Sequence, residues 1–191
     1  MSRTRKIAIG ALVAVALLCV WLWPLQGRRV LRSWLHDWQR ARATGLFLDP
    51  EGLAIDPAGN VWVADEDRTE LFVLKADGTL LARGQSSAGI DRLTAGDAMA
   101  VVGPGHVVAI SDQYLVEIKL EGAALKGLRT FGRRGTGDGE FGDPEGLTRD
   151  PATGELWLAD ENNRRVIVYD KDGRFVRHFG VDHECEGIAL T

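Results

Sequence analysis

A five-residue motif, Asp-Pro-Glu-Gly-Leu, occurs twice in this chain, at Asp49–Leu53 and Asp143–Leu147. Each copy opens a similar succession of short apolar runs and glycine turns, and a more divergent copy begins between them. A fourth copy starts near the end of the sequence. The acidic residues that open the four copies are spaced by 46, 48 and 41 residues and are Glu51, Asp97, Glu145 and Glu186. A repeat of this size predicts an architecture in which each unit buries its apolar surface against its neighbours.

Each repeat predicts four short strands. Apolar runs without alternation, such as Val61–Ala64, are typical of strands that are buried on both faces. Asp-Gly pairs follow the third run of the first and third repeats, and glycine accepts the positive φ of a tight hairpin turn. In the first repeat we expect strands near Gly52–Asp56, Val61–Ala64, Leu71–Leu74 and Thr79–Arg83. Four-stranded units of about 40 to 50 residues are typical of β-propeller blades, so the predicted fold class is all-β.

The third repeat carries further landmarks. Phe131-Gly132 opens a glycine-rich linker that ends at Phe141, Pro144-Glu145-Gly146 follows, and Asn163-Arg164-Arg165 precedes the third strand. These elements resemble the NHL repeat, and the resemblance covers roughly residues 43–191. It implies a propeller of four-stranded NHL-type blades, and such propellers usually have six. About three blades and one strand are present, so we expect a fragment truncated from six blades; the alternative is a half-propeller that closes by dimerising.

The amino-terminal 42 residues differ from the rest. A short basic tail (1–6) precedes an uncharged run of nineteen residues (7–25), which is long enough to span a bilayer. We predict an uncleaved transmembrane signal anchor; a cleaved signal peptide is the competing interpretation. Residues 26–42 predict an amphipathic juxtamembrane helix on the membrane surface or a linker helix packed on the propeller. Since large domains translocate with little regard to charge, we expect a single-pass membrane protein with its propeller (43–191) extracytoplasmic, periplasmic or at the cell surface.

Charge separates the two parts of the chain. Residues 1–42 hold eight Lys and Arg and one acid, so residues 43–191 carry 15 basic and 26 acidic side chains, a net charge of −11. Nucleic-acid affinity depends largely on neutralisation of phosphates by Lys and Arg. Some NHL propellers bind RNA, but they do so with a basic face. An acidic domain therefore predicts no nucleic-acid partner.

The four acids that open the repeats, Glu51, Asp97, Glu145 and Glu186, are the candidate ligand-binding residues. The first strand of a propeller blade lines the central channel, so equivalent positions are expected to form a ring. Converging carboxylates repel one another unless a cation, a proton or a basic ligand neutralises them, and oxygen ligands suit calcium or magnesium. The alternative is that each acid faces solvent at the channel mouth. The metal candidates are Glu51, Glu145 and Glu186, and the cofactor itself is left open.

Two other motifs are interpreted structurally. Gly137-Asp138-Gly139-Glu140-Phe141-Gly142 matches the dinucleotide pattern Gly-x-Gly-x-x-Gly, but no helix follows it, so we predict a linker between blades. Asp65-Glu66 and Asp160-Glu161 end second strands, and these acids are expected to accept hydrogen bonds from the following turns. No spacing supports a nucleophile with a general base, and no catalytic residue is predicted.

These observations favour a membrane-anchored propeller that binds a protein, a peptide or a small ligand. The alternative is a propeller hydrolase that uses a divalent metal and acids at the central channel. The Glu-Gly opening of the repeats is similar to that of the gluconolactonase-like propellers, where a glutamate at this place helps to hold a divalent metal. The stretch from Glu145 to Gly187 is faintly similar to the β-propeller phytases, which use calcium ions. Whether the chain is an enzyme stays open at this point, and a hydrolase is the less favoured interpretation.

Overall fold

The computed structural model of this chain describes residues 45–84, 98–111 and 113–190. One compact unit spans Phe47–Lys75 and Thr79–Thr191, and the sheets described below belong to it; a second unit comprises Met1–Leu46 with the turn residues Ala76–Gly78. Every regular element within the described residues is a β-strand. The all-β prediction is therefore confirmed for this part of the chain.

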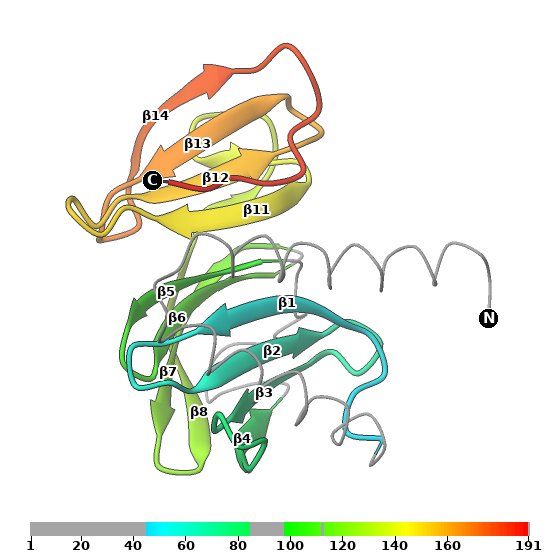
Figure 1. Ribbon diagram of the computed structural model, residues 1–191. Helices are drawn as coiled ribbons and strands as arrows, with labels where there is room; N and C mark the ends of the chain where they lie inside the picture. The colour runs from blue at the N-terminus through cyan, green and yellow to red at the C-terminus, as the bar shows by residue number, and fades with distance from the viewer. Residues whose placement is uncertain (1–44, 85–97, 112, 191) are drawn as a thin grey trace. The chain divides into compact units, whose positions relative to one another are not determined.

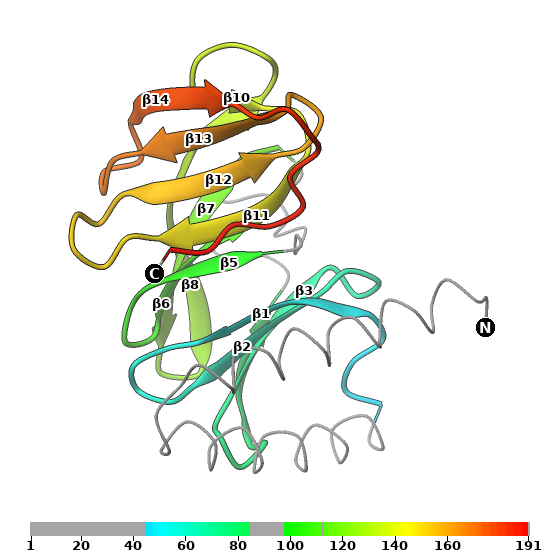
Figure 2. The same cartoon turned by 45° about the horizontal axis from the view of Figure 1, so that its top comes forward.

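Three four-stranded antiparallel sheets follow one another along the sequence (Figures 1 and 2). In each sheet the strands lie in the order in which they occur in the chain. Sheet 1 contains β1 (Pro50–Ile55), β2 (Val61–Asp65), β3 (Glu70–Leu74) and β4 (Leu80–Gly84). Sheet 2 contains β5 (Met99–Gly103), β6 (His106–Ile110), β7 (Leu115–Glu121) and β8 (Ala124–Phe131). Sheet 3 contains β11 (Pro144–Arg149), β12 (Leu156–Asp160), β13 (Arg165–Tyr169) and β14 (Phe175–Gly180).

The predicted strands of the first repeat agree with β1 to β4 to within about two residues, a usual difference at element ends. The predicted hairpin turns are also present. Gly173 has φ 75° and its amide donates to the carbonyl of Asp170 at 2.9 Å, and Gly78 has φ 83°. A side chain at either position would strain the turn, which explains the Asp-Gly pair after the third strand.

Two apolar clusters join consecutive sheets. Trp62, Leu71 and Val73 of sheet 1 pack in one cluster with sheet 2 residues that include Val107 and Val116. The opposite face of sheet 2 packs in a second cluster with sheet 3. That cluster contains Val108, Ile110 and Leu115 together with Leu147, Leu156, Leu158, Ile167 and Tyr169. Sheet 2 is thus buried on both faces, which is why its central strands are apolar at consecutive positions.

The glycine-rich linker connects sheet 2 to sheet 3. Its two short strands, β9 (Arg133–Arg134) and β10 (Glu140–Phe141), pair in parallel, and the Gly-x-Gly-x-x-Gly match begins in the loop between them and runs through β10 to Gly142. No helix follows the loop; β11 does. The prediction of a linker between blades is confirmed.

The amino-terminal predictions fall outside the described residues. These are the basic tail (1–6), the transmembrane anchor (7–25) and the juxtamembrane helix (26–42). Within the part of the chain that the structure describes, no helix has the length and hydrophobicity that crossing a membrane requires.

Candidate functional site

A buried aspartate ends the second strand of sheets 1 and 3 and fixes the entry to the first strand. Asp65 accepts hydrogen bonds from the amides of Leu48 at 2.7 Å and Asp49 at 3.2 Å, and Asp160 accepts from Gly142 at 2.8 Å and Asp143 at 3.2 Å. Both aspartate side chains are completely shielded from solvent. A buried carboxylate is stable in this setting because several donors satisfy its oxygens.

The expected hydrogen bonds to the following turn are found in both sheets. The amide of Arg68 donates to Asp65 at 3.0 Å, and the side-chain amide of Asn163 donates to Asp160 at 2.7 Å. The bonds that reach back to the first strand are a finding beyond that prediction. Each aspartate therefore holds the first strand and the turn after the second strand together at one edge of its sheet.

The candidate residues Glu51 and Glu145 lie at irregularities in the first strands. In sheet 1 the pairing passes from Pro50 opposite Asp65 to Gly52 opposite Ala64, so Glu51 is an extra residue, and Glu145 is its equivalent between Pro144 and Gly146. Such a bulge bends the strand and redirects a side chain, and bulges are common beside functional sites. The repeated Pro-Glu-Gly motif thus encodes the same bulge twice.

Each bulge contributes to a group of three carboxylates. Asp49, Glu51 and Glu66 each offer an oxygen within 4.8 Å of the others in sheet 1, and the same holds for Asp143, Glu145 and Glu161 in sheet 3. We call these the first and second acidic triads. Their backbones are tied together as well, since the amide of Glu66 donates to Asp49 at 2.9 Å and that of Glu161 donates to Asp143 at 2.8 Å.

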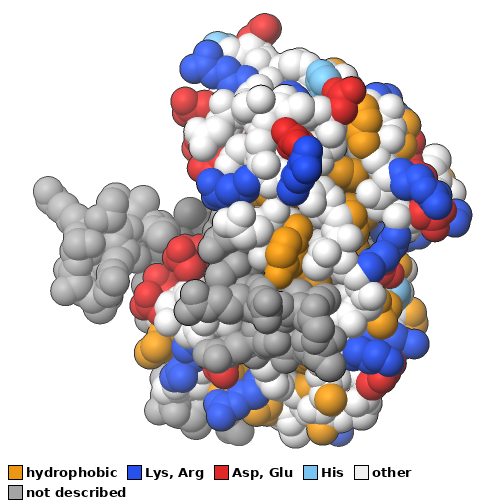
Figure 3. Space-filling model, turned by 180° about the vertical axis from the view of Figure 1, so that it is seen from behind, with side chains coloured by type: hydrophobic (Ala, Val, Ile, Leu, Met, Phe, Trp, Pro, Cys, Tyr) orange, Lys and Arg blue, Asp and Glu red, His pale blue; other side chains and the backbone are white. Residues whose placement is uncertain are grey.

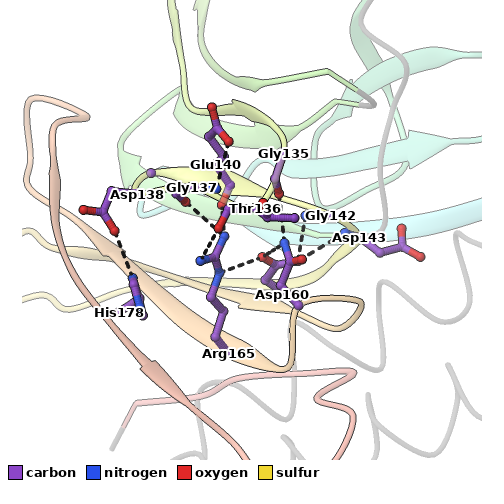
Figure 4. A network of polar contacts seen from close by, with 12 residues as sticks. Gly135, Thr136, Gly137, Asp138, Glu140, Gly142, Asp143, Asp160, Arg165 and His178 are labelled. Carbon is purple, nitrogen blue, oxygen red and sulfur yellow. Dashed lines mark hydrogen bonds and ion pairs between the residues drawn. The ribbon is translucent and has the colours of Figure 1, made fainter.

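A polar network supports the second triad from the interior (Figure 4). Arg165 donates to Asp160 at 3.2 Å and to the linker carbonyls of Thr136, Gly137 and Glu140 at 3.0, 3.1 and 2.7 Å. The side-chain amide of Asn163 also donates to a linker carbonyl. The Asn-x-Arg element therefore attaches the glycine-rich linker to the same aspartate that positions the first strand.

Figure 4 also shows that the side chain of Asp143 points away from Asp160, although its amide donates to Asp160. The carboxylate of Asp143 is thereby directed toward the second triad rather than into the buried network. The two carboxylates have different surroundings: Asp160 is a buried structural acceptor, whereas the carboxylate of Asp143 accepts a hydrogen bond from the side-chain amide of Asn162 at 3.3 Å and lies 4.0 Å from the guanidinium of Arg134.

The electrostatics of the second triad favour a cation or a proton. The pKa of the Glu161 carboxyl is raised above its usual value by partial burial and by the negative charges of Glu184, Asp143 and Glu186. Crowded carboxylates destabilise one another when all are ionised. The arrangement can hold a hard divalent cation through oxygen ligands or bind a cationic group such as a guanidinium or an ammonium.

The structure brings together some of the acids expected from the sequence. Glu51 belongs to the first triad and Glu145 to the second. Glu186 is exposed and is not a member of either triad, although its charge acts on Glu161. Asp97 lies outside the described residues. The predicted single ring of acids at the channel is not tested by these contacts, and it stays a prediction.

Four triad members were not among the predicted site residues: Asp49, Glu66, Asp143 and Glu161. Their signal was present in the sequence. The first acid of each Asp-Pro-Glu-Gly-Leu motif and the second acid of each Asp-Glu pair after the second strand recur in both repeats. Antiparallel pairing of the first two strands brings the start of the first strand beside the end of the second strand. These acids therefore lie together at one end of the strand pair.

Comparison with known proteins agrees with this architecture. Residues 47–74 match the NHL repeat family. Over 50 residues the chain is 48% identical to the RING finger protein nhl-1 of Caenorhabditis elegans, a match that covers 26% of this chain and 5% of that protein. Over 147 residues it is 31% identical to peptidyl-glycine alpha-amidating monooxygenase of Mus musculus, which covers 69% of this chain and 15% of the relative.

A solved structure of similar fold is that of the RRP9 WD40 repeats. It aligns with a TM-score of 0.57 at 15% sequence identity, over 72% of this chain and 40% of that chain. WD40 repeats form four-stranded propeller blades. The chain thus spans a small share of the curated relatives and less than half of this structural neighbour, and the likeness concerns the fold of the sheets.

Proposed function

Since this chain belongs to the NHL-repeat β-propeller proteins, we propose that it is a binding module whose ligand is a protein, a peptide or a small molecule with a cationic group. The observation that carries this proposal is the acidic triad, which two repeats build in the same way. A rigid sheet presents each triad at an edge, where the pleated scaffold fixes the positions of the carboxylates.

The buried aspartates support a role in recognition. Asp65 and Asp160 are buried and accept hydrogen bonds from backbone amides and turn side chains, whereas the triad acids beside them are half-buried or exposed. A cationic ligand would relieve the repulsion among the triad carboxylates. Charge complementarity of this kind contributes to specificity and to the rate of association.

We further propose that the module is anchored in a membrane by residues 7–25 and acts outside the cytoplasm. The nineteen uncharged residues and the preceding basic tail support this. Nucleic acid is not an expected ligand, because the propeller part is acidic. On the face drawn in Figure 3, acidic and basic side chains of the described residues are interspersed, and no continuous basic surface is present there.

A pull-down from envelope fractions tests the binding function. The bait is the full chain, and the variant carries Glu51→Gln and Glu145→Gln, one substitution in each triad. We expect the variant to lose a partner that the unmodified chain captures at low salt. Glu121→Gln is the control, because Glu121 is an exposed acid paired with Lys126 and lies away from both triads. Equal capture by all three chains would contradict a role of the triads in binding.

The geometry of the triads also favours a second function, that of a divalent-metal-dependent propeller hydrolase. Three carboxylate oxygens within 4.8 Å of one another fit a calcium or magnesium ion that completes its shell with water or substrate oxygens. In sheet 3 the residues that would hold it are Asp143, Glu145 and Glu161. Such an ion would polarise a carbonyl or phosphoryl oxygen of a lactone or a phosphoester. Turnover of either substrate that depends on added metal and on Glu145 would favour the enzyme over the binding module.

A further inference from the structure

Sheet 3 holds the loop of the glycine-rich linker from one side. Five backbone carbonyls of the linker accept hydrogen bonds from side chains of sheet 3. Arg165 donates to the carbonyls of Thr136, Gly137 and Glu140, Asn163 donates to that of Gly135, and Tyr169 donates to that of Gly139. With its carbonyls bound in this way, the loop keeps a fixed orientation of its peptide groups.

On the other side of the loop, backbone amides converge on one carboxylate. The amide of Gly137 donates to Oε2 of Glu140 at 2.8 Å, and the amide of Thr136 also donates to this carboxylate. The Arg133 guanidinium lies against the second oxygen, with Nε at 2.7 Å and Nη2 at 2.5 Å from Oε1. These donors, the Gly137 amide first among them, lower the pKa of Glu140 below its usual value. Figure 4 shows the Glu140 carboxylate on the side of the loop away from Arg165.

Two glycines make room for this carboxylate. A methyl group on Gly135 would overlap Oε2 of Glu140, and a methyl group on Gly137 would lie 3.0 Å from the same oxygen. Successive backbone amides that point into one concavity form a binding site for anions. The loop is therefore an oxyanion cradle, and the anion that fills it in this structure is the side chain of Glu140.

The cradle gives a physical reason for the Gly-x-Gly-x-x-Gly match. Gly137 is the first residue of the match and Glu140 is the fourth. In nucleotide-binding loops, glycines allow backbone amides to approach a phosphate. Here the same chemistry acts on a carboxylate. A phosphate group has three acceptor oxygens and up to two negative charges, so it suits the same amides and guanidinium.

The cradle is accessible from solvent at Arg133. The side chain of Arg133 is 77% exposed, and that of Glu140 is 19% exposed. Two further charged side chains of the linker have their own partners: Asp138 lies 3.5 Å from His178, and Arg134 lies 4.0 Å from Asp143. In Figure 4 the carboxylate of Asp138 is directed toward His178 and not into the cradle. Glu140 is thus the acid that an incoming anion has to displace.

We propose that the linker loop is a binding site for a phosphate group, and that the carboxylate of Glu140 closes this site until a phosphate displaces it. On displacement, the amides of Thr136 and Gly137 and the guanidinium of Arg133 donate to phosphate oxygens. Arg165 holds the loop from the other side in both states. Glu140 is therefore an autoinhibitory anion. This proposal does not rest on the acidic triads, which favour a cation.

A titration of the full natural chain with inorganic phosphate tests the site. At constant ionic strength, we expect the amide chemical shifts of Thr136 and Gly137 to change in a saturable way as phosphate is added. The measurement follows the two amides that donate to Glu140, so it reports on the cradle and not on general binding of anions. Unchanged shifts would overturn the proposal, because Glu140 would then be a permanent structural anion.

Two substitutions of Glu140 separate the filling of the cradle from its charge. Glu140→Ala empties the cradle, whereas Glu140→Gln removes the charge and keeps a side chain of similar size in place. We expect phosphate affinity to rise from the natural chain to Glu140→Gln and again to Glu140→Ala, by about tenfold or more in total. Equal affinities of the two variants would show an effect of charge alone and would contradict displacement from the cradle.

Matched changes elsewhere test the two kinds of donor. Arg133→Ala should abolish phosphate binding in the Glu140→Ala background. Glu155→Ala is the control: it frees Arg177 from a similar ion pair, in which Arg177 donates to both carboxylate oxygens of Glu155, but that pair lacks the loop amides. It should leave phosphate affinity at the level of the natural chain. A gain as large as that of Glu140→Ala would show that any freed arginine suffices, and the cradle would lose its role.

The source of the phosphate group is identified with the same two amides. Vesicles that contain phosphatidic acid present the group on a lipid, and inorganic phosphate presents it free in solution. Shifts of Thr136 and Gly137 with both probes would assign the site to a lipid headgroup. Shifts with free phosphate alone would assign it to a soluble phosphate compound.

Discussion

The carboxylate of Asp56 accepts a hydrogen bond from the backbone amide of Gly105, 49 residues further along the chain, at 2.8 Å. The same carboxylate accepts from the Trp62 indole at 3.1 Å and from the side chain of Asn60 at 2.9 Å. Burial alone would raise the pKa of Asp56, but these donors together lower it below its usual value. Through these hydrogen bonds Asp56 connects its own turn, the buried Trp62 of sheet 1 and the first hairpin of sheet 2.

Replacing Asp56 with alanine should destabilise the fold by about 1–3 kcal/mol, because the buried Trp62 indole and the Gly105 amide lose their acceptor. Urea unfolding measures the change. Asp150→Ala is the matched control, since Asp150 holds the equivalent place in sheet 3 but is more exposed and bonds only within its own turn. We expect a smaller loss there. Equal losses would contradict the role of Asp56 between sheets.

The contribution of Asp56 should depend on pH in a defined direction. Its pKa is lowered on folding, so its stabilisation is complete above the ordinary value of 3.8 and is lost as the pH falls through the lower folded value. The stability difference between the natural chain and Asp56→Ala should therefore shrink only in acid below about pH 4. A difference that shrinks between pH 5 and 7 would indicate another group.

Asp160→Ala should cost about 3–5 kcal/mol, because it leaves the buried guanidinium of Arg165 without its carboxylate and releases the amides of Gly142 and Asp143. Thermal or urea unfolding measures the loss. Arg133→Ala breaks an exposed ion pair with Glu140 and should cost less than about 1 kcal/mol. A loss as small as that of the control would show that the network in Figure 4 does not support the linker.

The sequence predicted the repeat, the four strands of each complete unit, the hairpin glycines and the linker, because these depend on local patterns. Apolar runs specify buried strands, and Asp-Gly specifies a turn with positive φ. The second strand of sheet 2, β6, forms from an apolar run even though that repeat lacks the Pro-x-Gly element. A repeat that lacks one motif can still form its strands, because the fold is determined by the burial of whole sheets and not by a single residue.

The site could be predicted only in part. The equivalence of Glu51 and Glu145 was visible in the repeat, but the grouping of each with an acid fifteen or sixteen residues away depends on strand register and on the bulge. A shift of one residue moves every side chain to the other face of the sheet, so register cannot be read from composition. The contacts of Arg129 and Asp56 with neighbouring sheets could not be predicted from the sequence for the same reason.

Gly146→Ala should loosen the segment Cys185–Leu190, because the new methyl group would meet the backbone of Gly187 and Ile188 at 2.9 Å. Backbone atoms cannot rotate away as a side chain can, so the segment must shift. Amide exchange and limited proteolysis of residues 185–190 measure the effect. Gly187→Ala is the control, since no atom lies within 4 Å of its added methyl group. Equal protection in both variants would contradict the close approach.

Glu161→Gln should stabilise the fold at neutral pH. The pKa of Glu161 is raised in the folded state, so ionisation destabilises the folded chain, and the penalty is absent below the ordinary value of 4.5, where the carboxyl is protonated in both states. The advantage of the variant should vanish as the pH falls toward 4.5. Glu155→Gln is a control of opposite sign, because its bonds to Arg177 lower the pKa of Glu155 and stabilise the ionised form.

The last prediction concerns the acidic triads. It distinguishes a triad that binds a metal ion from a group of acids that binds none. An ion that binds only the folded chain stabilises it by mass action, by about 2.7 kcal/mol at a hundredfold excess over the dissociation constant. If a triad holds calcium or magnesium, added ion should raise the melting temperature, and Glu51→Gln with Glu145→Gln should abolish the rise. The metal-free variant should melt at an equal or higher temperature, because one charge is removed from each crowded triad. Glu121→Gln should keep the rise. If the unmodified chain shows no rise at millimolar ion, the hydrolase loses its support, and the triads remain as candidate sites for an organic cation.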